Sequence, residues 1–301
     1  MNLESHSIKS LSGEIICPGD KSISQRILII GSLLNCDIKI SGFLDAEDPN
    51  STMLALNNLG ASIKKDKNIV SISHRSKPFS NPSSFLDLGN SGTGMRLLTG
   101  FISGLNIKAT LIGDESLSKR PMSRVVDPLT LMGKEISTNN GKAPIQIKGG
   151  NIKDNFEYVM PIASAQVKSS LMLASLSSGN SIKITEAKIT RDHTEKMIEY
   201  LGGSIEVSES SEGKTIFLKN SKLSKISTYE VVGDFSSAAF IIVAALISKN
   251  SEVMIKNVGL NKTRSGLLEV LLKMNANIEI INKTKTCNED CGDIIVKSSQ
   301  L

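Results

Sequence analysis

The hydrophobic positions of the chain follow two periods that alternate along its length. At four places a patch of small residues opens a run with apolar residues three and four positions apart, which is typical of a helix. These runs start at Gly19, Gly89, Ala163 and Gly233, so they are 70, 74 and 70 residues apart. A short segment in which apolar and polar residues alternate, as in a strand, follows each run. This regular spacing predicts four copies of one structural unit.

A second helical run in each copy ends in a recurring way. The ends fall at Gly60, Gly133, Gly202 and Asn275, which are 73, 69 and 73 residues apart. Gly or Asn just past the last apolar turn favours the left-handed backbone conformation that terminates many helices. Further alternating segments complete each copy. The pattern therefore predicts the order βαβαββ four times over.

The distribution of apolar side chains predicts which elements lie inside. The run at 236–247 is apolar on nearly every side, which is not expected of a helix that faces solvent. The strands have one polar face instead, because Ile182 and Ile184 alternate with Lys183 and Thr185. We therefore expect an α/β protein with its helices inside and its sheets outside.

Composition narrows the class of protein. The chain has 301 residues, 40% of them hydrophobic and 22% charged, which suits about two globular domains. With 35 Lys and Arg against 30 Asp and Glu, no Trp and 4% aromatics, no nucleic-acid partner is expected. The longest apolar stretch, 238–247, is too short for a bilayer, and the N-terminal segment printed here lacks the apolar core and the cleavage site of a signal peptide. Four scattered cysteines argue against a disulfide framework. We expect a reduced, cytoplasmic monomer without a membrane partner, a metal site or a cofactor.

The helix starts carry the candidate chemistry. Lys21 stands at the entrance of the first helix, and Ser22 and Arg26 share one of its faces. Free N–H groups and the positive dipole end of a helix favour anions. The second start contains three glycines around Gly92, which allow close backbone approach, and the third offers the hydroxyl of Ser164. Taken alone, each segment is as typical of a capped surface helix or a tight turn as it is of an anion site.

Arginine recurs near the second helices. Arg120, Arg191 and Arg264 lie 13, 11 and 11 residues before the Gly or Asn that ends their copies. A cation at a helix N-terminus opposes the dipole at a cost of about 0.3–1 kcal/mol. Recurrence in three copies favours a bound anion for at least some of them. His193 and Glu195 could form an acid–base pair, although polar residues in a first helical turn are commonly structural.

Six segments, in this order and spacing, give the chain a family resemblance. PGDKSISQR, LGNSGTGMR, ESLSKRPM, ASAQVKSSLMLA, ITRDHTE and GDFSSAAF resemble the 5-enolpyruvylshikimate-3-phosphate synthase family over essentially all 301 residues. The resemblance implies an inside-out barrel of two domains, each of three βαβαββ units. It implies four of six units here, with one complete domain at 19–230 and an incomplete second domain formed by 1–18 and 231–301.

The resemblance also implies an activity and a site. The enolpyruvyl group of phosphoenolpyruvate would be transferred to the 5-hydroxyl of shikimate 3-phosphate, with release of phosphate and without a metal or cofactor. Where some relatives have Ser-Lys, this chain has Thr190-Arg191. The implied residues for shikimate 3-phosphate are Lys21, Ser22, Arg26, Ser164, Ala165, Gln166, Thr190 and Arg191. Those for phosphoenolpyruvate are Lys21, Asn90, Gly92, Arg120 and Gln166.

Two alternatives stay open. The sister transferase that acts on UDP-N-acetylglucosamine shares the fold, but it uses a Cys on the loop that here reads GDESLSKRPM without one. The chain could also be a shikimate-3-phosphate-binding fragment without turnover, because the family's catalytic Asp and Glu are expected beyond residue 301.

This expectation is testable on the 301-residue chain itself. We expect it to bind shikimate 3-phosphate weakly and not to release phosphate from phosphoenolpyruvate. Acid–base catalysis alone is worth about 10²–10⁴-fold, and missing units would also remove substrate positioning. A phosphate-release assay with both substrates measures this. Turnover near that of a full-length relative would contradict it and would make Glu195 and His193 the first residues to substitute.

Overall fold

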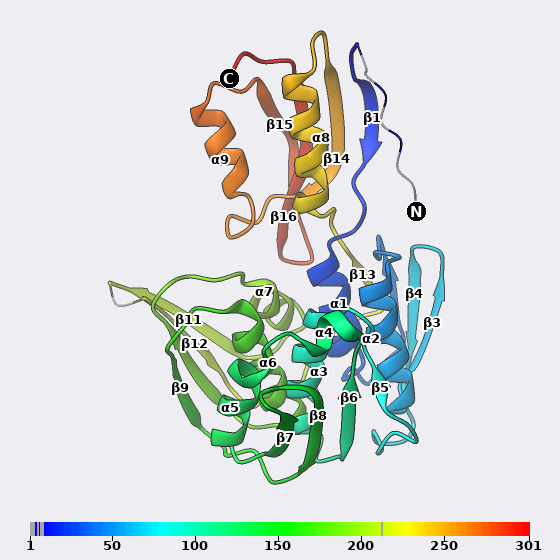
Figure 1. Ribbon diagram of the computed structural model, residues 1–301, viewed down its shortest axis with the longest axis vertical. Helices are drawn as coiled ribbons and strands as arrows, with labels where there is room; N and C mark the ends of the chain where they lie inside the picture. Colours follow the sequence, from blue (N-terminus) through cyan, green and yellow to red (C-terminus); the bar gives the residue numbers. More distant parts are fainter. Residues whose placement is uncertain (1–3, 5, 7–8, 212) are drawn as a thin grey trace. The chain divides into compact units, whose positions relative to one another are not determined.

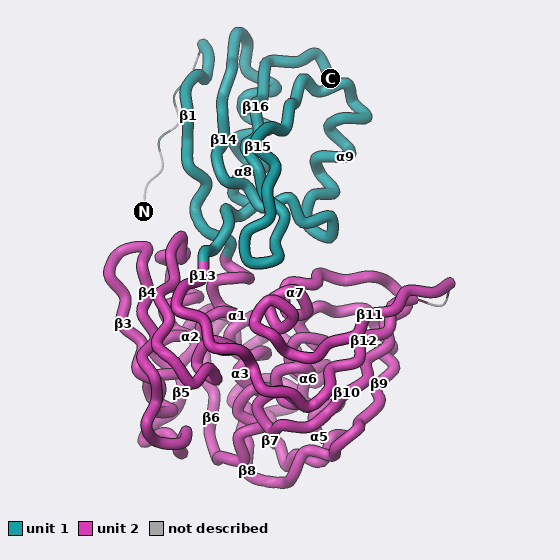
Figure 2. Tube along the Cα trace, turned by 180° about the vertical axis from the view of Figure 1, so that it is seen from behind, with its two compact units in different colours: residues 1–20, 230–301 teal, residues 21–229 magenta. Residues whose placement is uncertain are grey.

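The computed structural model describes residues 4, 6, 9–211 and 213–301. The chain forms two compact units, which are described separately (Figure 2). Unit 1 consists of residues 1–20 and 230–301, and unit 2 consists of residues 21–229. That unit 2 is a complete substrate-binding domain, and unit 1 part of a second one, stays a prediction.

The elements follow the order βαβαββ four times, with one additional short helix, α4, in the second copy (Figure 1). The helices are α1 (Lys21–Gly31), α2 (Glu47–Asn58), α3 (Gly92–Gly104), α4 (Glu115–Ser118), α5 (Ser123–Leu131), α6 (Ala165–Ser178), α7 (His193–Tyr200), α8 (Phe235–Ile247) and α9 (Gly266–Lys273). The strands of the first two copies are β1 (Ser12–Ile16), β2 (Ile38–Ser41), β3 (Ser62–Asp66), β4 (Ile69–Ser73), β5 (Leu86–Asp87), β6 (Ala109–Ile112), β7 (Glu135–Asn139) and β8 (Lys142–Gly149). Those of the last two are β9 (Phe156–Met160), β10 (Ile182–Glu186), β11 (Ile205–Ser210), β12 (Gly213–Leu218), β13 (Thr228–Glu230), β14 (Glu252–Gly259), β15 (Ile278–Thr286) and β16 (Glu289–Lys297).

The strands form four sheets of four strands with one shared order. The second and third copies each build a sheet from their own strands, β5-β6-β8-β7 and β11-β12-β10-β9. The first and fourth copies exchange their first strands, which gives β1-β14-β16-β15 and β13-β2-β4-β3. In the three sheets that contain β1, β5 and β9, this first strand runs parallel to its neighbour, and the other pairings are antiparallel.

The predicted helix ends are confirmed. Gly60, Gly133, Gly202 and Asn275 all have positive φ, between 63° and 109°. Glycine adopts this left-handed region without steric cost, and Asn tolerates it better than most residues. The repeated stop in the sequence therefore has the same backbone cause in all four copies.

In unit 2 the helices lie inside and the sheets outside, as predicted (Figure 1). Helix α6 is buried along nine consecutive residues, 167–175, and Phe101 of α3 is fully buried. The strands alternate as expected of sheets with one wet face: in β10, Ile182 and Ile184 are buried and Lys183 is exposed. The two helices approach closely because α3 presents Gly100 and Gly104 to α6.

Unit 1 differs from expectation at α8. One face of this helix packs on its sheet through Ala238, Ile242 and Ala245, which belong to the core of unit 1. The opposite face is open, with Phe240 79% and Ile247 68% exposed. The prediction that α8 is buried on all sides is therefore wrong for unit 1 taken by itself, because a single sheet covers only one side of a helix.

Two further observations bear on the sequence-based expectations. Among the described residues, no helix has both the length and the apolarity needed to cross a bilayer. The four cysteines are free thiols.

The close helix pair in unit 2 predicts an intolerant glycine. A Cβ at Gly100 would lie 2.0 Å from the carbonyl oxygen of Ser170 in α6. We expect Gly100→Ala to lower the free energy of unfolding by about 1–3 kcal/mol, as overpacking does, although alanine favours helices. Urea unfolding measures the change. The control is Gly266→Ala in α9, where a Cβ has open space; equal loss in both variants would contradict the packing argument.

Candidate anion site at the helix starts of unit 2

The entrance of α1 carries a cation that is partly exposed. Lys21 is the first residue of α1, and its Nζ lies 3.1 Å from Oδ2 of Asp48 in α2. Nearly half of the Lys21 side chain, 48%, is open to solvent. Asp48 was not among the candidate residues from the sequence, and the structure makes it a counter-ion that holds Lys21 at the entrance.

Gln25 ties the start of α1 to that of α3. Its Nε2 donates to Oγ of Ser91 at 2.7 Å and lies 3.3 Å from Oγ1 of Thr52 in α2. Ser91 is the N-cap of α3, and its Oγ accepts from the N–H of Gly94. One buried amide group therefore brings the starts of two helices together.

A second bridge connects α3 with α6. Nη1 of Arg96 donates to Oε1 of Gln166 at 2.9 Å, and Nε2 of Gln166 donates to Oγ1 of Thr93, also at 2.9 Å. Ser164 caps α6 by accepting from the N–H of Val167. The predicted residues Ser164, Ala165 and Gln166 thus lie at a helix start that is fixed against α3.

Asn90 and Arg120 lie beside the same helix start. Arg120 donates to Oδ1 of Asn90, whose Nδ2 donates to Asp114 at 2.7 Å. The pKa of the Asp114 carboxyl lies below its usual value because the N–H of Leu117 and the amide of Asn90 donate to it. These contacts are therefore retained above the usual carboxyl pKa and are lost as the pH falls through the lowered value.

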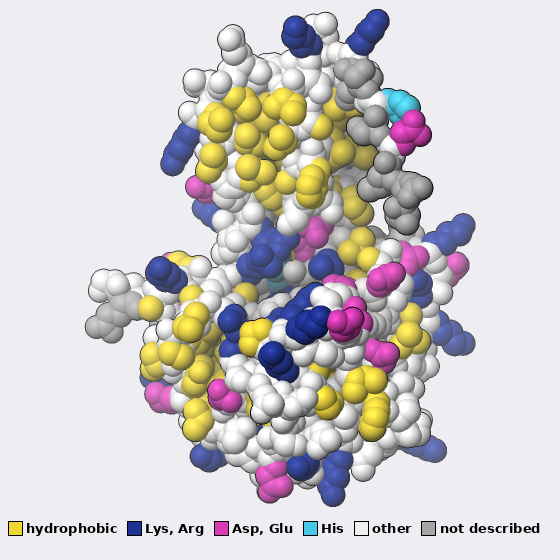
Figure 3. Space-filling model, in the orientation of Figure 1, with side chains coloured by type: hydrophobic (Ala, Val, Ile, Leu, Met, Phe, Trp, Pro, Cys, Tyr) yellow, Lys and Arg dark blue, Asp and Glu magenta, His cyan; other side chains and the backbone are white. Residues whose placement is uncertain are grey.

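Gly92 leaves room for two guanidinium groups. A Cβ at this position would lie 3.0 Å from Nη1 of Arg120 and 3.2 Å from Nη1 of Arg96. Burial and the positive charges of Arg124 and Arg120 lower the pKa of Arg96. Arg96 is thus repelled by two neighbouring arginines near the start of α3, and an anion there would relieve the repulsion. Lys and Arg side chains gather on the face of unit 2 where α4 lies (Figure 3).

Arg26 lies deeper than the other cations, with only 3% of the residue exposed. Its Nε donates to Oγ1 of Thr194 at 2.8 Å and its Nη2 to Oγ of Ser169 at 2.9 Å. Its Nη1 donates to the carbonyl of Ser22. Arg26 therefore joins α1 to α6 and α7, and Ser22 lies about one helical turn before it in α1.

The remaining predicted arginines separate into two cases. Thr190 and Arg191 lie in the segment that enters α7, with Arg191 exposed. Arg264 lies instead in unit 1, where its Nη2 is 3.0 Å from Asp234 and 3.7 Å from Asp20. A bound anion is therefore not needed to explain Arg264, because carboxylates of the same unit compensate its charge.

A buried cluster of charges was missed by the sequence interpretation. Nζ of Lys168 lies 2.8 Å from Oε1 of Glu186 and 2.6 Å from Oε1 of Glu195. All three side chains are at least 95% buried. Glu195 therefore belongs to an ion pair inside unit 2, and its neighbour His193 is buried as well. Only the first-turn position of Glu195 was visible in the sequence.

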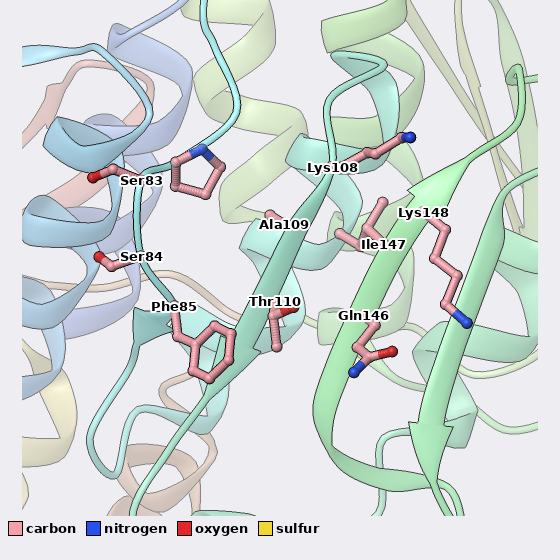
Figure 4. A pocket seen from close by; sticks show the side chains of 10 residues that line it. Ser83, Ser84, Phe85, Lys108, Ala109, Thr110, Gln146, Ile147 and Lys148 are labelled. Carbon is pink, nitrogen blue, oxygen red and sulfur yellow. The ribbon is translucent and has the colours of Figure 1, made fainter.

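A hollow elsewhere on unit 2 has no part in this site. A cavity of about 580 Å³ lies over β6 and β8, and its lining includes Phe85, Lys108, Thr110, Gln146 and Lys148 (Figure 4). These side chains stand on the outer face of their sheet. Among the described residues, no three His, Cys, Asp or Glu side chains are grouped so that they could hold a metal ion.

Comparison with known proteins shows the family of the chain. Residues 6–300 match the family described as EPSP synthase (3-phosphoshikimate 1-carboxyvinyltransferase). The chain is 45% identical over 306 residues to the 3-phosphoshikimate 1-carboxyvinyltransferase of Petrotoga mobilis, covering 100% of this chain and 70% of the relative. It is 43% identical over 301 residues to that of Bartonella quintana, covering 97% and 66%. The solved EPSP synthase of Acinetobacter baumannii is similar with a TM-score of 0.87 at 37% identity, over 97% of this chain and 66% of that one.

The bridge through Ser91 predicts a stability effect. Ser91→Ala removes the N-cap of α3 and a partner of the buried Gln25 amide, so we expect the free energy of unfolding to fall by about 1–3 kcal/mol. Urea unfolding measures this. Ser164→Ala, which removes a cap held by a longer bond of 3.4 Å, serves as the comparison and should cost less. A larger loss in Ser164→Ala would contradict the role given to Gln25.

Proposed function

Because the chain belongs to the EPSP synthase family, we propose that unit 2 binds shikimate 3-phosphate and phosphoenolpyruvate at the starts of α1, α3 and α6. The family's reaction transfers the enolpyruvyl group of phosphoenolpyruvate to the 5-hydroxyl of shikimate 3-phosphate and releases phosphate. It is a step of the shikimate pathway towards chorismate and the aromatic amino acids.

The observation that carries this proposal is the convergence of three helix N-termini with cationic side chains. Gln25 joins α1 to α3, and the Arg96–Gln166 contact joins α3 to α6. Lys21 and Arg120 lie at two of these starts. Helix N-termini and cations both favour anions, and both substrates carry phosphate and carboxylate groups.

We assign the substrate contacts accordingly. The proposed contacts of shikimate 3-phosphate are Lys21, Ser22, Arg26, Ser164, Ala165, Gln166, Thr190 and Arg191. The proposed contacts of phosphoenolpyruvate are Lys21, Asn90, Gly92, Arg120 and Gln166. Gln166 is suited to a position between the two sets because Arg96 and Thr93 fix both ends of its amide.

The chemistry suits these residues in part. A site built from fixed donors and cations stabilises charge that develops during addition and elimination. The reaction also needs a general acid for the methylene carbon and a general base for the hydroxyl. Glu195 is a poor candidate for either task, because its carboxylate is buried against Lys168. We therefore assign binding and orientation of the substrates to unit 2 and leave proton transfer unassigned.

The loop that contains α4 favours this substrate over UDP-N-acetylglucosamine. The Cys expected on this loop in the sister transferase is absent from 113–122 in the sequence, and the loop instead contributes Arg120. A monomeric state and a cytoplasmic location stay predictions from the sequence.

Substitution of Arg26 tests the proposal. Loss of a charged hydrogen-bond partner costs about 1.5–3 kcal/mol, so Arg26→Ala should weaken shikimate 3-phosphate binding roughly 10- to 100-fold. Titration calorimetry on the 301-residue chain measures the dissociation constant.

Arg75→Ala is the matched control. Arg75 donates to the carbonyl of Ser32, beyond the C-terminal end of α1, and stacks on Phe79. Its loss should leave the affinity unchanged. Equal affinity of parent and Arg26→Ala, or no binding by the parent, would overturn the assignment.

A further inference from the structure

We propose that the buried cluster of Lys168, Glu186 and Glu195 is a positioning device that holds Thr190 and Arg26 in place for shikimate 3-phosphate. The inference rests on the proposed function, because it takes Thr190 and Arg26 as substrate contacts. None of the three cluster residues needs to touch substrate for this role. Glu186 accepts from Thr190 itself. Lys168 and Glu195 are sequence neighbours of Ser169 and Thr194, the two residues whose hydroxyls accept from Arg26.

The cluster joins three elements. Lys168 comes from α6, Glu186 is the last residue of β10, and Glu195 lies in the first turn of α7. A fourth charged residue lies on the neighbouring strand, because Lys214 of β12 is the register partner of Glu186 in β10 and is also buried. Lys168 and Lys214 together thus match the two carboxylates in number.

Such a cluster is not explained by stability alone. Taking charges out of water is unfavourable, and apolar side chains of similar size commonly stabilise a core as well as a buried ion pair does. Neither carboxylate oxygen of Glu195 accepts a hydrogen bond from the described residues, although Oε1 forms the ion pair with Lys168. The ion pairs instead fix positions, because each holds two elements at a set distance from each other.

The first element positioned in this way is the segment between β10 and α7. Oε1 of Glu186 accepts from the N–H of Thr190 at 3.2 Å, and Oε2 accepts from its Oγ1 at 2.6 Å. Residues 187–189 between them are exposed and belong to no helix or strand. The carboxylate of Glu186, itself fixed by Lys168, is therefore the anchor that sets the conformation of Thr190.

The second element is the set of hydroxyl groups around Arg26. Ser169 follows Lys168 in α6, and Thr194 precedes Glu195 in α7. The Lys168–Glu195 ion pair draws the two helices together, so that the two hydroxyls lie 2.7 Å apart. Both hydroxyls accept from the guanidinium of Arg26. The direction of the Arg26 side chain thus depends on the same lysine.

Unit 2 offers a matched control for the removal of a buried lysine. Lys134 is 2% exposed, and its Nζ donates to the carbonyl of Gly150 at 2.6 Å. Burial lowers the pKa of Lys134. It follows α5, and among the described residues its ammonium group donates to the Gly150 carbonyl and to none of the proposed substrate residues. Lys134→Met therefore removes a buried ammonium group without touching the cluster.

The experiment compares Lys168→Met, Glu186→Leu, Glu186→Gln and Lys134→Met in the 301-residue chain. Titration calorimetry gives the dissociation constant of shikimate 3-phosphate, hydrogen exchange gives the protection of 187–194, and thermal unfolding gives the midpoint. Loss of an anchor of this kind should weaken binding about 10-fold or more. We expect this loss, with faster exchange of 187–194, in Lys168→Met and Glu186→Leu.

The other two variants separate positioning from stability. Lys134→Met should lower the unfolding midpoint while its dissociation constant stays within about 2-fold of the parent. Glu186→Gln keeps an oxygen that accepts from Thr190, so its affinity should lie closer to the parent than that of Glu186→Leu. A higher affinity of Glu186→Gln than of Glu186→Leu would not be expected if the affinity for shikimate 3-phosphate depended only on the stability of the fold.

Three outcomes would overturn the inference. They are parent-like affinity and exchange in both Lys168→Met and Glu186→Leu, a loss of affinity in Lys134→Met as large as theirs, or identical behaviour of Glu186→Gln and Glu186→Leu. If Lys168→Met does not fold, the two Glu186 variants decide alone. Absence of binding by the parent would overturn the proposed function instead, and the exchange of 187–194 in the ligand-free variants would still decide whether the cluster orders this segment.

Discussion

The close contact between α3 and α6 is the constraint on which the site in unit 2 depends. A Cβ at Gly100 or Gly104 would lie within about 2 Å of α6 atoms, 2.0 Å from the Ser170 carbonyl or from Ser177 Oγ. Small residues therefore set the distance between the two helices before any polar contact is made. At this distance Oγ of Ser170 reaches the carbonyl of Arg96 at 2.9 Å, and the two helix starts lie close enough for one Arg–Gln contact to join them. Packing in the core thus determines where the donors of the site converge.

Much of the fold could be predicted from the sequence because its causes are local. The left-handed helix ends need only Gly or Asn at one position, as Gly133 and Asn275 show, and strand alternation needs only neighbouring residues. The helix starts were recognisable for the same reason, since small and cationic residues lie within a few positions of one another. The exposed face of α8 was not predictable, because an apolar helix in the sequence does not show how many sides its own unit covers.

The site residues that the sequence missed are those defined by contacts between distant segments. Asp48 is an ordinary first-turn acid in its own helix and becomes a counter-ion only beside Lys21. Lys168 lies in the buried part of α6, 18 residues before one partner, Glu186. Nothing in the local pattern separates it from an exposed lysine. Charge pairs of this kind are visible only once the fold has brought α6, α7 and β10 together.

The second and fourth copies carry different charges at the start of their first helix. In the fourth copy the N-cap of α8 is Asp234, whose carboxylate accepts from the helix N–H of Ser236 and contacts Arg264. In the second copy the N-cap of α3 is the neutral Ser91, and Arg120 donates to neutral groups on Asn90 and Ser116. The same backbone geometry therefore carries an internal anion in one copy and a cationic surface in the other. In these two copies, therefore, the capping side chains Ser91 and Asp234 differ in charge although both cap the helix in the same way, by accepting from a backbone N–H of its first turn.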